Sequence, residues 1–239
     1  MIEKLLLKLR KRDEISREEE RALVDTIAEV EDVPAKQTVI KRGEALNRSV
    51  LLIDGLMCRY KDLRNGRRQI TALHVAGDFL DLHGFTLKHL DHDVMSLSPS
   101  RVAYASHERL TRLTESYPHL TRLLWFSTNL DAAIHREWEL SLGQRSGPAK
   151  AAHLICELYT RLEIVGLVRE HDFELPLNQT ELGECLGLTV VHTNRVLKEL
   201  RERGLVQFRG GTVSIHDVDA LKNFAGFDPT YLYLASYSR

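Results

Sequence analysis

Residues 178–200 have the sequence NQTELGECLGLTVVHTNRVLKEL. Asn178 is a favoured helix N-cap, and Glu181 three residues later completes a capping box. Gly187 can adopt the left-handed conformation that ends a helix, because it has no Cβ. Thr189 can then cap a second helix. A helix, a short turn and another helix in this order predict a helix-turn-helix motif.

The second helix of this motif has two different faces. At helical spacing an inward face is formed by Thr193, Val196, Leu197 and Leu200. The outward face carries Val190, Val191, Asn194, Arg195 and Lys198. In a major groove, valine suits a thymine methyl, asparagine an adenine edge and arginine a guanine edge. The outward face therefore predicts contact with DNA bases, with a helical protein-interaction module as the alternative.

A basic hairpin is expected after this helix. Residues 205–208 and 212–215 are strand-forming segments on either side of Arg209-Gly210-Gly211. We interpret the hairpin as a wing with Arg209 at its tip, where a phosphate contact would position the protein; a plain solvated turn is the alternative. From Arg195 to Arg209 the chain carries five basic and two acidic residues, a local excess of three positive charges.

The whole chain lacks this excess, since its 239 residues include 33 basic and 34 acidic ones, a net charge of −1. DNA binding must therefore depend on the local basic face. With 43% hydrophobic residues the chain can bury a core, and its length predicts one or two domains. No apolar run approaches the roughly 20 residues of a membrane span, and the charged start at residues 1–5 does not resemble a secretory signal. We expect a cytoplasmic protein without a membrane partner.

The three cysteines, Cys58, Cys156 and Cys185, are far apart in the sequence and form no CxxC pair. Structural zinc and an iron–sulfur cluster held only by this chain are therefore not expected. We interpret the cysteines as reduced thiols and expect no cofactor.

The first part of the chain changes from helical to extended patterns. Residues 1–33 are expected to form two helices, the second opened by a capping box at Ser16–Glu19 and ended by Pro34. On one face this second helix should carry Ala22, Leu23, Ile27 and Val30. From there to about Ser106, short strands alternate with turns, including an Asn-Gly hairpin turn. The expected strands lie at residues 38–40, 50–53, 57–60, 70–75, 94–97 and 102–105. This spacing predicts a small barrel or sandwich.

After Pro118 a helix of about 25 residues is expected, uninterrupted until Gly143. Its apolar stripe is too broad for one neighbour, so we expect the barrel on one side and a second copy of the chain on the other. Burial within a single domain is the alternative. The residues predicted for the dimer interface are Leu123, Phe126, Leu130, Ile134 and Trp138. A short break at Ser146-Gly147-Pro148 is a candidate hinge.

The order of helices, barrel, long helix and winged helix-turn-helix resembles the cyclic-AMP receptor/Fnr superfamily of bacterial transcription regulators. The most specific motifs are Gly187-Leu188-Thr189-Val190 through Asn194–Lys198, followed by Gly77-Asp78-Phe79. The resemblance implies an α+β fold. Residues 1–117 would hold N-terminal helices and a cyclic-nucleotide-binding-like β-barrel, residues 118–145 a dimerisation helix, and residues 146–239 the DNA-binding domain.

The same resemblance implies a homodimer that binds double-stranded DNA at a palindromic operator, with RNA polymerase as a further partner if it is an activator. On this template the base-reading positions are Val190, Val191, Asn194 and Arg195. A glutamate is usual where this chain has Val191, so cytosine recognition by that carboxylate is not expected. With the caps and the wing included, the expected DNA-binding residues are Asn178, Gln179, Thr189, Val190, Val191, His192, Asn194, Arg195, Lys198 and Arg209.

The barrel differs from family members that bind cyclic nucleotides, which carry a Gly-Glu pair after Gly-Asp-Phe and then an arginine for the phosphate. Here Leu82 stands nearest the glutamate position, and residues 69–100 contain no arginine. Asp91 and Asp93 lie where the phosphate would need a cation. We therefore do not expect a conventionally bound cyclic nucleotide.

Three alternatives remain for the barrel. It can bind another small molecule, serve as a structural body without a ligand, or hold a metal or haem. The candidate ligands for the last are His74, His83, His89, His92, Asp81 and Asp91. An Fnr-type cluster is not expected, since no cysteine precedes Cys58.

Enzymatic function has little support, because the GxGxxG, GxxxxGK, GxSxG and HExxH patterns are all missing. Asp91-His92-Asp93 near Ser96 and Ser98 is a weak hydrolase candidate. The sequence favours a dimeric transcription regulator that is not an enzyme. A barrel-based scaffold that does not contact DNA is the second hypothesis.

Overall fold

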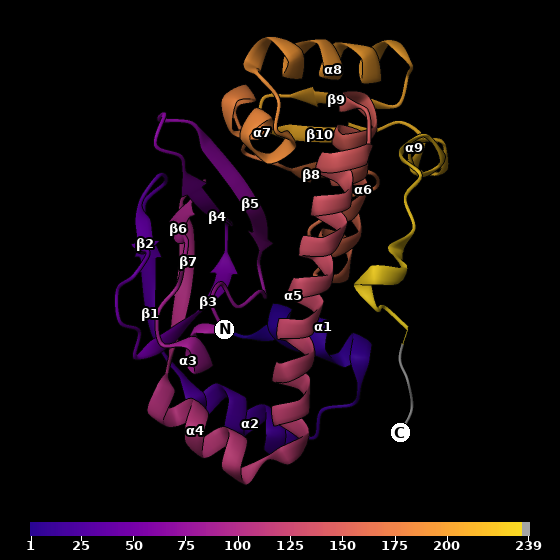
Figure 1. Cartoon of the computed structure of the whole chain (residues 1–239). Coiled ribbons are helices and arrows are strands. Elements are labelled where there is room, and N and C mark those ends of the chain that lie inside the picture. The colour runs from indigo at the N-terminus through magenta and orange to yellow at the C-terminus, as the bar shows by residue number, and fades with distance from the viewer. Residues whose placement is uncertain (236–239) are drawn as a thin grey trace. The chain divides into compact units, whose positions relative to one another are not determined.

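The computed structural model describes residues 1–235, which form two compact units (Figure 1). One unit comprises Met1–Lys61, Leu73–Ala133 and the chain end that begins at Tyr233; the other comprises Asp62–Ala72 and Ile134–Leu232. The first part of the chain contains α1 Glu3–Arg12, α2 Arg17–Thr26, β1 Ile27–Val33, β2 Thr38–Ile40, β3 Arg48–Asp54, β4 Leu56–Asp62, β5 Arg68–Val75, α3 Gly84–Leu87, β6 Asp93–Ser96, β7 Ser100–Ser106, α4 His107–Ser116 and α5 Pro118–Gln144.

The strands form the expected barrel from two antiparallel sheets, with orders β1-β7-β3 and β2-β6-β4-β5. Side chains of a strand alternate between its two faces. In β3, Val50 and Leu52 belong to the core inside the barrel, where they meet Met57 and Val94 of the other sheet. Leu51, between them, belongs to a second core with residues of α1, α2, α4 and the start of α5. The sheet β1-β7-β3 therefore supports both cores.

The expected second helix ends earlier than the sequence indicated. α2 stops at Thr26, and Ile27 and Val30 lie in β1, so the prediction of one helical face through Val30 is wrong. β1 pairs with β7, and its register shifts between Ile27 and Glu29. Only the two ends of β1, Ile27 and Val33, are buried. Because the irregularity removes the alternating pattern, the sequence shows no strand signal here.

The Gly77-Asp78 turn is attached to the first helix. Gly77 has φ +91°, and a Cβ there would lie 2.7 Å from the backbone carbon of Lys4 and 2.8 Å from its oxygen. Asp78 accepts the N–H of Val75 at 2.8 Å and forms an ion pair with Lys8. A glycine is therefore required both by the backbone conformation and by the close approach of α1.

The long helix occurs as α5, Pro118–Gln144, close to the expected bounds. Its residues are not all placed as the dimer hypothesis assumed. Leu123 is buried in the core shared with α1, α2 and α4. Trp138 is also buried, and its indole N–H donates to the Glu157 carboxylate at 3.2 Å. The chain itself therefore covers these two side chains.

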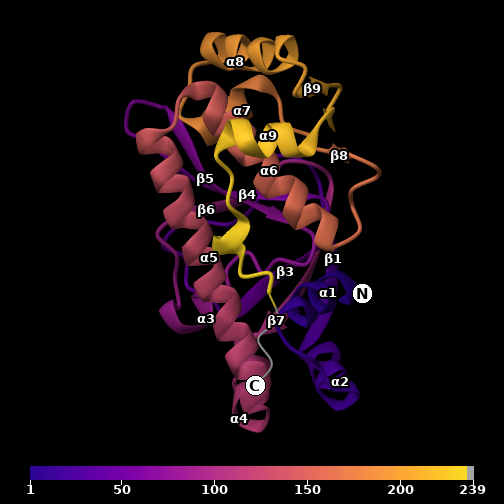
Figure 2. The ribbon, with the colours of Figure 1, turned by 90° about the vertical axis from the view of Figure 1, so that its right-hand side faces the viewer.

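The second unit contains the expected helix-turn-helix and hairpin, and the hairpin is followed by a further helix that the sequence did not predict (Figure 2). Its elements are α6 Gly147–Ile164, β8 Asp172–Glu174, α7 Gln179–Leu186, α8 Val190–Glu202, β9 Val206–Arg209, β10 Thr212–Ile215, α9 Val218–Ala225 and the 3-10 turn Pro229–Leu232. The strands form a sheet of order β8-β10-β9.

At the centre of this unit Glu157 on α6 is fully buried. Besides the Trp138 indole, it accepts hydrogen bonds from Arg161 at 2.9 Å and from the Tyr231 hydroxyl at 3.0 Å. Burial and the Glu157 charge raise the pKa of Tyr231 well above its usual value. This buried carboxylate thus joins the end of α5, α6 and the final turn.

All three cysteines are buried and none is in a disulfide. No helix in residues 1–235 is long and apolar enough to cross a membrane.

We expect Gly77→Ala to lower the free energy of unfolding by about 3 kcal/mol. The change combines a positive φ, costing about 1–2 kcal/mol, with a clash against α1 of about 1–3 kcal/mol. Gly66→Ala is the matched control, because Gly66 has φ +79° but open space around its Cβ position. It should cost only the conformational part, about 1–2 kcal/mol. Urea denaturation of both variants measures the difference, and equal losses would contradict the assigned contact.

Candidate functional site

The first helix of the motif, α7, begins and ends as the sequence predicts. The Asn178 side chain accepts the N–H of Glu181 at 2.9 Å, and the Glu181 carboxylate accepts the N–H of Asn178 at 2.9 Å. Gly187 ends the helix with φ +65°. Gly183 has a further role, since a Cβ there would lie 2.7 Å from the carbonyl oxygen of Leu188 and 3.0 Å from Thr193 Oγ1. Its small size allows the turn and α8 to pack closely on α7.

The second helix, α8, presents the two expected faces. Its cap is Thr189, whose hydroxyl accepts the N–H of His192 at 3.3 Å. The inward face is buried at Thr193, Val196 and Leu200, while Leu197 is half-buried. The outward residues are all exposed: Val190, Val191, Asn194, Arg195 and Lys198. In Figures 1 and 2, α8 lies on the outer side of its unit with α7 beneath it.

A groove of about 430 Å³ lies on the wing side of α8. Its lining includes four residues that the sequence selected for DNA contact, namely Asn178, Gln179, Val190 and Arg209. The start of α7, the start of α8 and the wing thus line the same groove.

A second groove, of about 450 Å³, lies on the other side of α8, next to Pro148 at the start of α6. It brings together Thr189, Val191, His192 and Arg195. The two remaining candidates, Asn194 and Lys198, are exposed on α8, and at 100° per residue they fall between the two grooves.

The wing is formed by β9 and β10, which pair with Arg209 opposite Thr212. Gly210 and Gly211 make the connection, with φ +62° and +81°. Two successive positive φ values are typical of the tight turn that matches strand twist. Arg209 is exposed beside this turn.

Ion pairs reduce the local positive charge. Lys198 lies 3.6 Å from Glu202, and Arg203 lies 2.8 Å from Glu199. Arg195 has no such partner among residues 1–235. Among the described residues, no ion pair therefore offsets the charge of Arg195.

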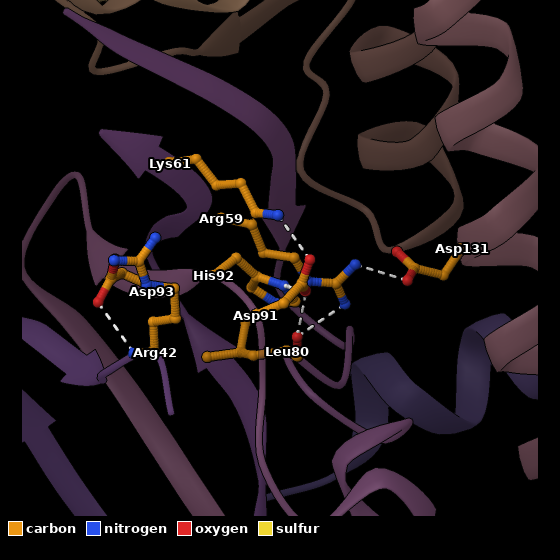
Figure 3. A network of polar contacts seen from close by, with 8 residues as sticks. All are labelled: Arg42, Arg59, Lys61, Leu80, Asp91, His92, Asp93 and Asp131. Carbon is orange, nitrogen blue, oxygen red and sulfur yellow. Dashed lines mark hydrogen bonds and ion pairs between the residues drawn. The ribbon is translucent and has the colours of Figure 1, made fainter. Parts of the chain in front are cut away.

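In the barrel, the structure reveals an arginine that the sequence analysis missed (Figure 3). Arg59 on β4 is only 3% exposed. Its Nε and Nη2 atoms donate to the carbonyl oxygen of Leu80 at 3.0 and 2.7 Å, and Nη1 donates to Asp131 Oδ2 at 2.6 Å. Arg59 precedes residues 69–100, the segment in which the family resemblance places a phosphate-binding arginine. Strand alternation is the signal that could have found it, since Met57 on the same face belongs to the barrel core.

The two aspartates that argued against an anion site have partners. Asp91 pairs with Lys61 and accepts the Nδ1 hydrogen of His92 at 2.9 Å, which together lower the pKa of Asp91. Asp93 accepts the N–H of Arg42 at 3.0 Å (Figure 3).

The histidine and aspartate candidates for a metal do not converge. Within residues 1–235, no three His, Cys, Asp or Glu side chains are placed to hold a metal ion. The rings of His83 and His92 lie 5.5 Å apart. Asp81 is fully buried, accepts the N–H of Val50 at 2.6 Å, and has a pKa raised by burial to about 7.

Comparison with known proteins supports both the barrel and the helix-turn-helix. The family model for the Crp-like helix-turn-helix domain matches residues 149–224, and that for the cyclic nucleotide-binding domain matches residues 30–117. The chain is 28% identical over 217 residues to the transcriptional activator protein FnrL of Cereibacter sphaeroides, covering 88% of this chain and 86% of FnrL. It is 26% identical to the fumarate and nitrate reduction regulatory protein of Escherichia coli, covering 80% and 76%.

Among solved structures, FixK2 from Bradyrhizobium japonicum has a TM-score of 0.76 at 22% identity, covering 84% of this chain and 98% of FixK2. That likeness supports the fold. The two matched domains and the regulators that are similar over most of the chain show that this protein belongs to the Crp/Fnr superfamily of DNA-binding transcription regulators.

Proposed function

We propose that the protein acts as a homodimer that binds a palindromic operator, with α8 of each copy in the major groove. The observation that carries this proposal is the outward face of α8, where Arg195 is exposed and unpaired among the described residues. Grooves on both sides of α8 are lined by further candidate residues. Because α8 lies between these two grooves of the protein surface, it is suited to enter the major groove of DNA.

The contacts divide into two kinds. Val190, Val191, Asn194 and Arg195 contact base edges in the proposed complex, and Arg195 bonds guanine in a bidentate way. The remaining candidates position the protein on the backbone: Asn178, Gln179, Thr189, His192, Lys198 and Arg209. The Thr189 hydroxyl accepts a hydrogen bond as the helix cap and still has its own hydrogen to donate to a phosphate.

For the dimer we propose a seam along the exposed side of α5. The exposed positions of α5 include 118, 140 and 144 as well as 122, 125, 129, 132, 136, 139 and 143, which follow one another in steps of three and four. This is the heptad spacing of a coiled coil. Trp125 on this side is 66% exposed, a large apolar surface to leave in water. Of the residues first predicted, Phe126 and Leu130 are half-buried and flank this seam, whereas Leu123, Ile134 and Trp138 are buried in the single chain.

The proposed dimer and DNA complex assign a role to each part of the chain. Residues 1–117 form a sensor-like body, residues 118–145 the dimerisation helix, and residues 146–239 the DNA-binding domain. We place the protein in the cytoplasm, with RNA polymerase as a partner if it activates transcription. The effector is not a conventionally bound cyclic nucleotide, because Leu82 replaces the carboxylate that would hold the ribose.

Arg195→Ala is expected to weaken operator binding by about 1–3 kcal/mol and to relax the preference at one position in each half-site. Selection of bound sequences from random duplex DNA measures both effects. Arg112→Ala is the control, since Arg112 is an exposed arginine of α4 paired with Glu108. Equal weakening on all sequences would make Arg195 a phosphate contact instead.

Trp125→Glu is expected to yield monomers that bind the operator poorly, since like charges would meet in the seam. Sedimentation equilibrium at micromolar concentration measures the change. Leu63→Glu, at a 50% exposed leucine of the barrel hairpin, should leave the dimer intact. Ile134→Asp is less decisive, because Ile134 is buried in the chain itself. A wild-type monomer, or a dimer that survives Trp125→Glu, would overturn the seam.

Cyclic AMP and cyclic GMP at physiological concentration are expected to change operator affinity by no more than a few-fold. An effector acts only through a higher affinity for one state, which here would require a strong hold on the phosphate. Titration into an operator-binding assay at fixed salt decides the point, since DNA affinity depends steeply on salt. A rise of about tenfold, within the usual range of allosteric coupling, would contradict the expectation.

A further inference from the structure

The barrel contains a buried cation whose charge is compensated from the long helix. Arg59 is only 3% exposed and lies on β4, and two of its nitrogens donate to the carbonyl oxygen of Leu80 (Figure 3). That oxygen accepts hydrogen bonds but carries no net charge. The negative charge at 2.6 Å is the carboxylate of Asp131 on α5.

Two other acids lie nearby but are placed differently from Asp131. Asp91 pairs with Lys61 on the exposed side of the loop, where its side chain is 77% exposed. Asp81 is fully buried and accepts the N–H of Val50 at 2.6 Å; burial raises its pKa to about 7, while the charge of Arg59 acts to lower it. A buried guanidinium that loses its counter-charge is strongly destabilised. The carboxylate that accepts a hydrogen bond from Arg59 thus comes from another element, α5.

The two partners differ in accessibility. Whereas Arg59 is almost completely enclosed, the Asp131 side chain is 29% exposed. Asp131 is thus the more accessible member of the pair, whereas the guanidinium is enclosed and also hydrogen-bonded to Leu80. Such a fixed, buried donor that faces a partly accessible position is the arrangement of a binding site for a small anion.

We propose that Arg59 forms a carboxylate-binding site in the barrel and that Asp131 is its built-in ligand. This inference rests on the proposed function, because it links the occupancy of the site to operator binding. Asp131, on the proposed dimerisation helix, supplies the negative charge that a free anionic effector would otherwise bring. The pair holds α5 against the barrel, and the DNA-competent state needs no added ligand. A free small carboxylate takes the same position only when Asp131 vacates it.

The first experiment measures the site without DNA. Asp131→Ala removes the carboxylate and keeps a strong helix former, so α5 should persist. Thermal unfolding is compared in about 0.1 M sodium acetate and about 0.1 M sodium chloride, which screen charges equally. Acetate should raise the Tm of Asp131→Ala by about 2–4 °C more than that of the wild type, since it refills the site. The double variant Arg59→Leu with Asp131→Ala should lose this gain.

The second experiment measures operator binding of the same variants in the same two salts. In chloride, Asp131→Ala should bind about tenfold more weakly than the wild type. Acetate should restore most of that ratio, and the double variant should not respond. Asp54→Ala is the control, because it removes a carboxylate from an exposed ion pair of the same barrel with Lys4.

The outcomes separate the two proposals. Wild-type affinity in Asp131→Ala would overturn the coupling, and the absence of an acetate effect on Tm would overturn the carboxylate site. A wild-type protein that binds no duplex would defeat the proposed function, while the thermal experiment would still decide whether Arg59 binds carboxylates.

Discussion

The close approach of two backbones at Gly183 determines how the DNA-facing side of the molecule is built. A side chain at this position would meet the carbonyl oxygen of Leu188 and the hydroxyl of Thr193. Without one, the turn packs directly on α7, and α8 follows with Thr193, Val196 and Leu200 buried. The orientation of α8 then leaves Arg195 and Val191 outside. The side chains proposed to face DNA thus depend on a buried glycine that has no side chain of its own.

In a chain of net charge −1, residues 195–209 carry a local excess of three positive charges. Within α8, Glu202 and Glu199 lie close to Lys198 and Arg203 and offset part of their charge. Such exposed pairs contribute little to stability. In the proposed complex they reduce the charge available to any DNA, so a larger share of binding would fall on donors outside these pairs, such as Arg195. Discrimination between sequences benefits from this division.

The sequence predicted those parts of the structure that local chemistry determines. The caps at Asn178 and Thr189, the left-handed Gly187 and the two faces of α8 follow from residues close to one another in the chain. β1 was missed because its irregular pairing with β7 hides the alternation. Arg59 was missed because its partners, Leu80 and Asp131, are remote in sequence. On α5, periodicity identified a broad apolar stripe but not which part of it the chain itself covers.

The placement of the two tryptophans gives each a different spectroscopic environment. Trp138 is buried, and its indole N–H is bound to the Glu157 carboxylate, at the junction of α5 with α6. Trp125, on the same helix, is 66% exposed in the single chain. Fluorescence from Trp125 is open to aqueous quenchers such as iodide until another surface covers it, whereas Trp138 emits from an enclosed, hydrogen-bonded site. One unlabelled chain therefore carries separate optical reporters for the outer side of the long helix and for the integrity of the DNA-binding half.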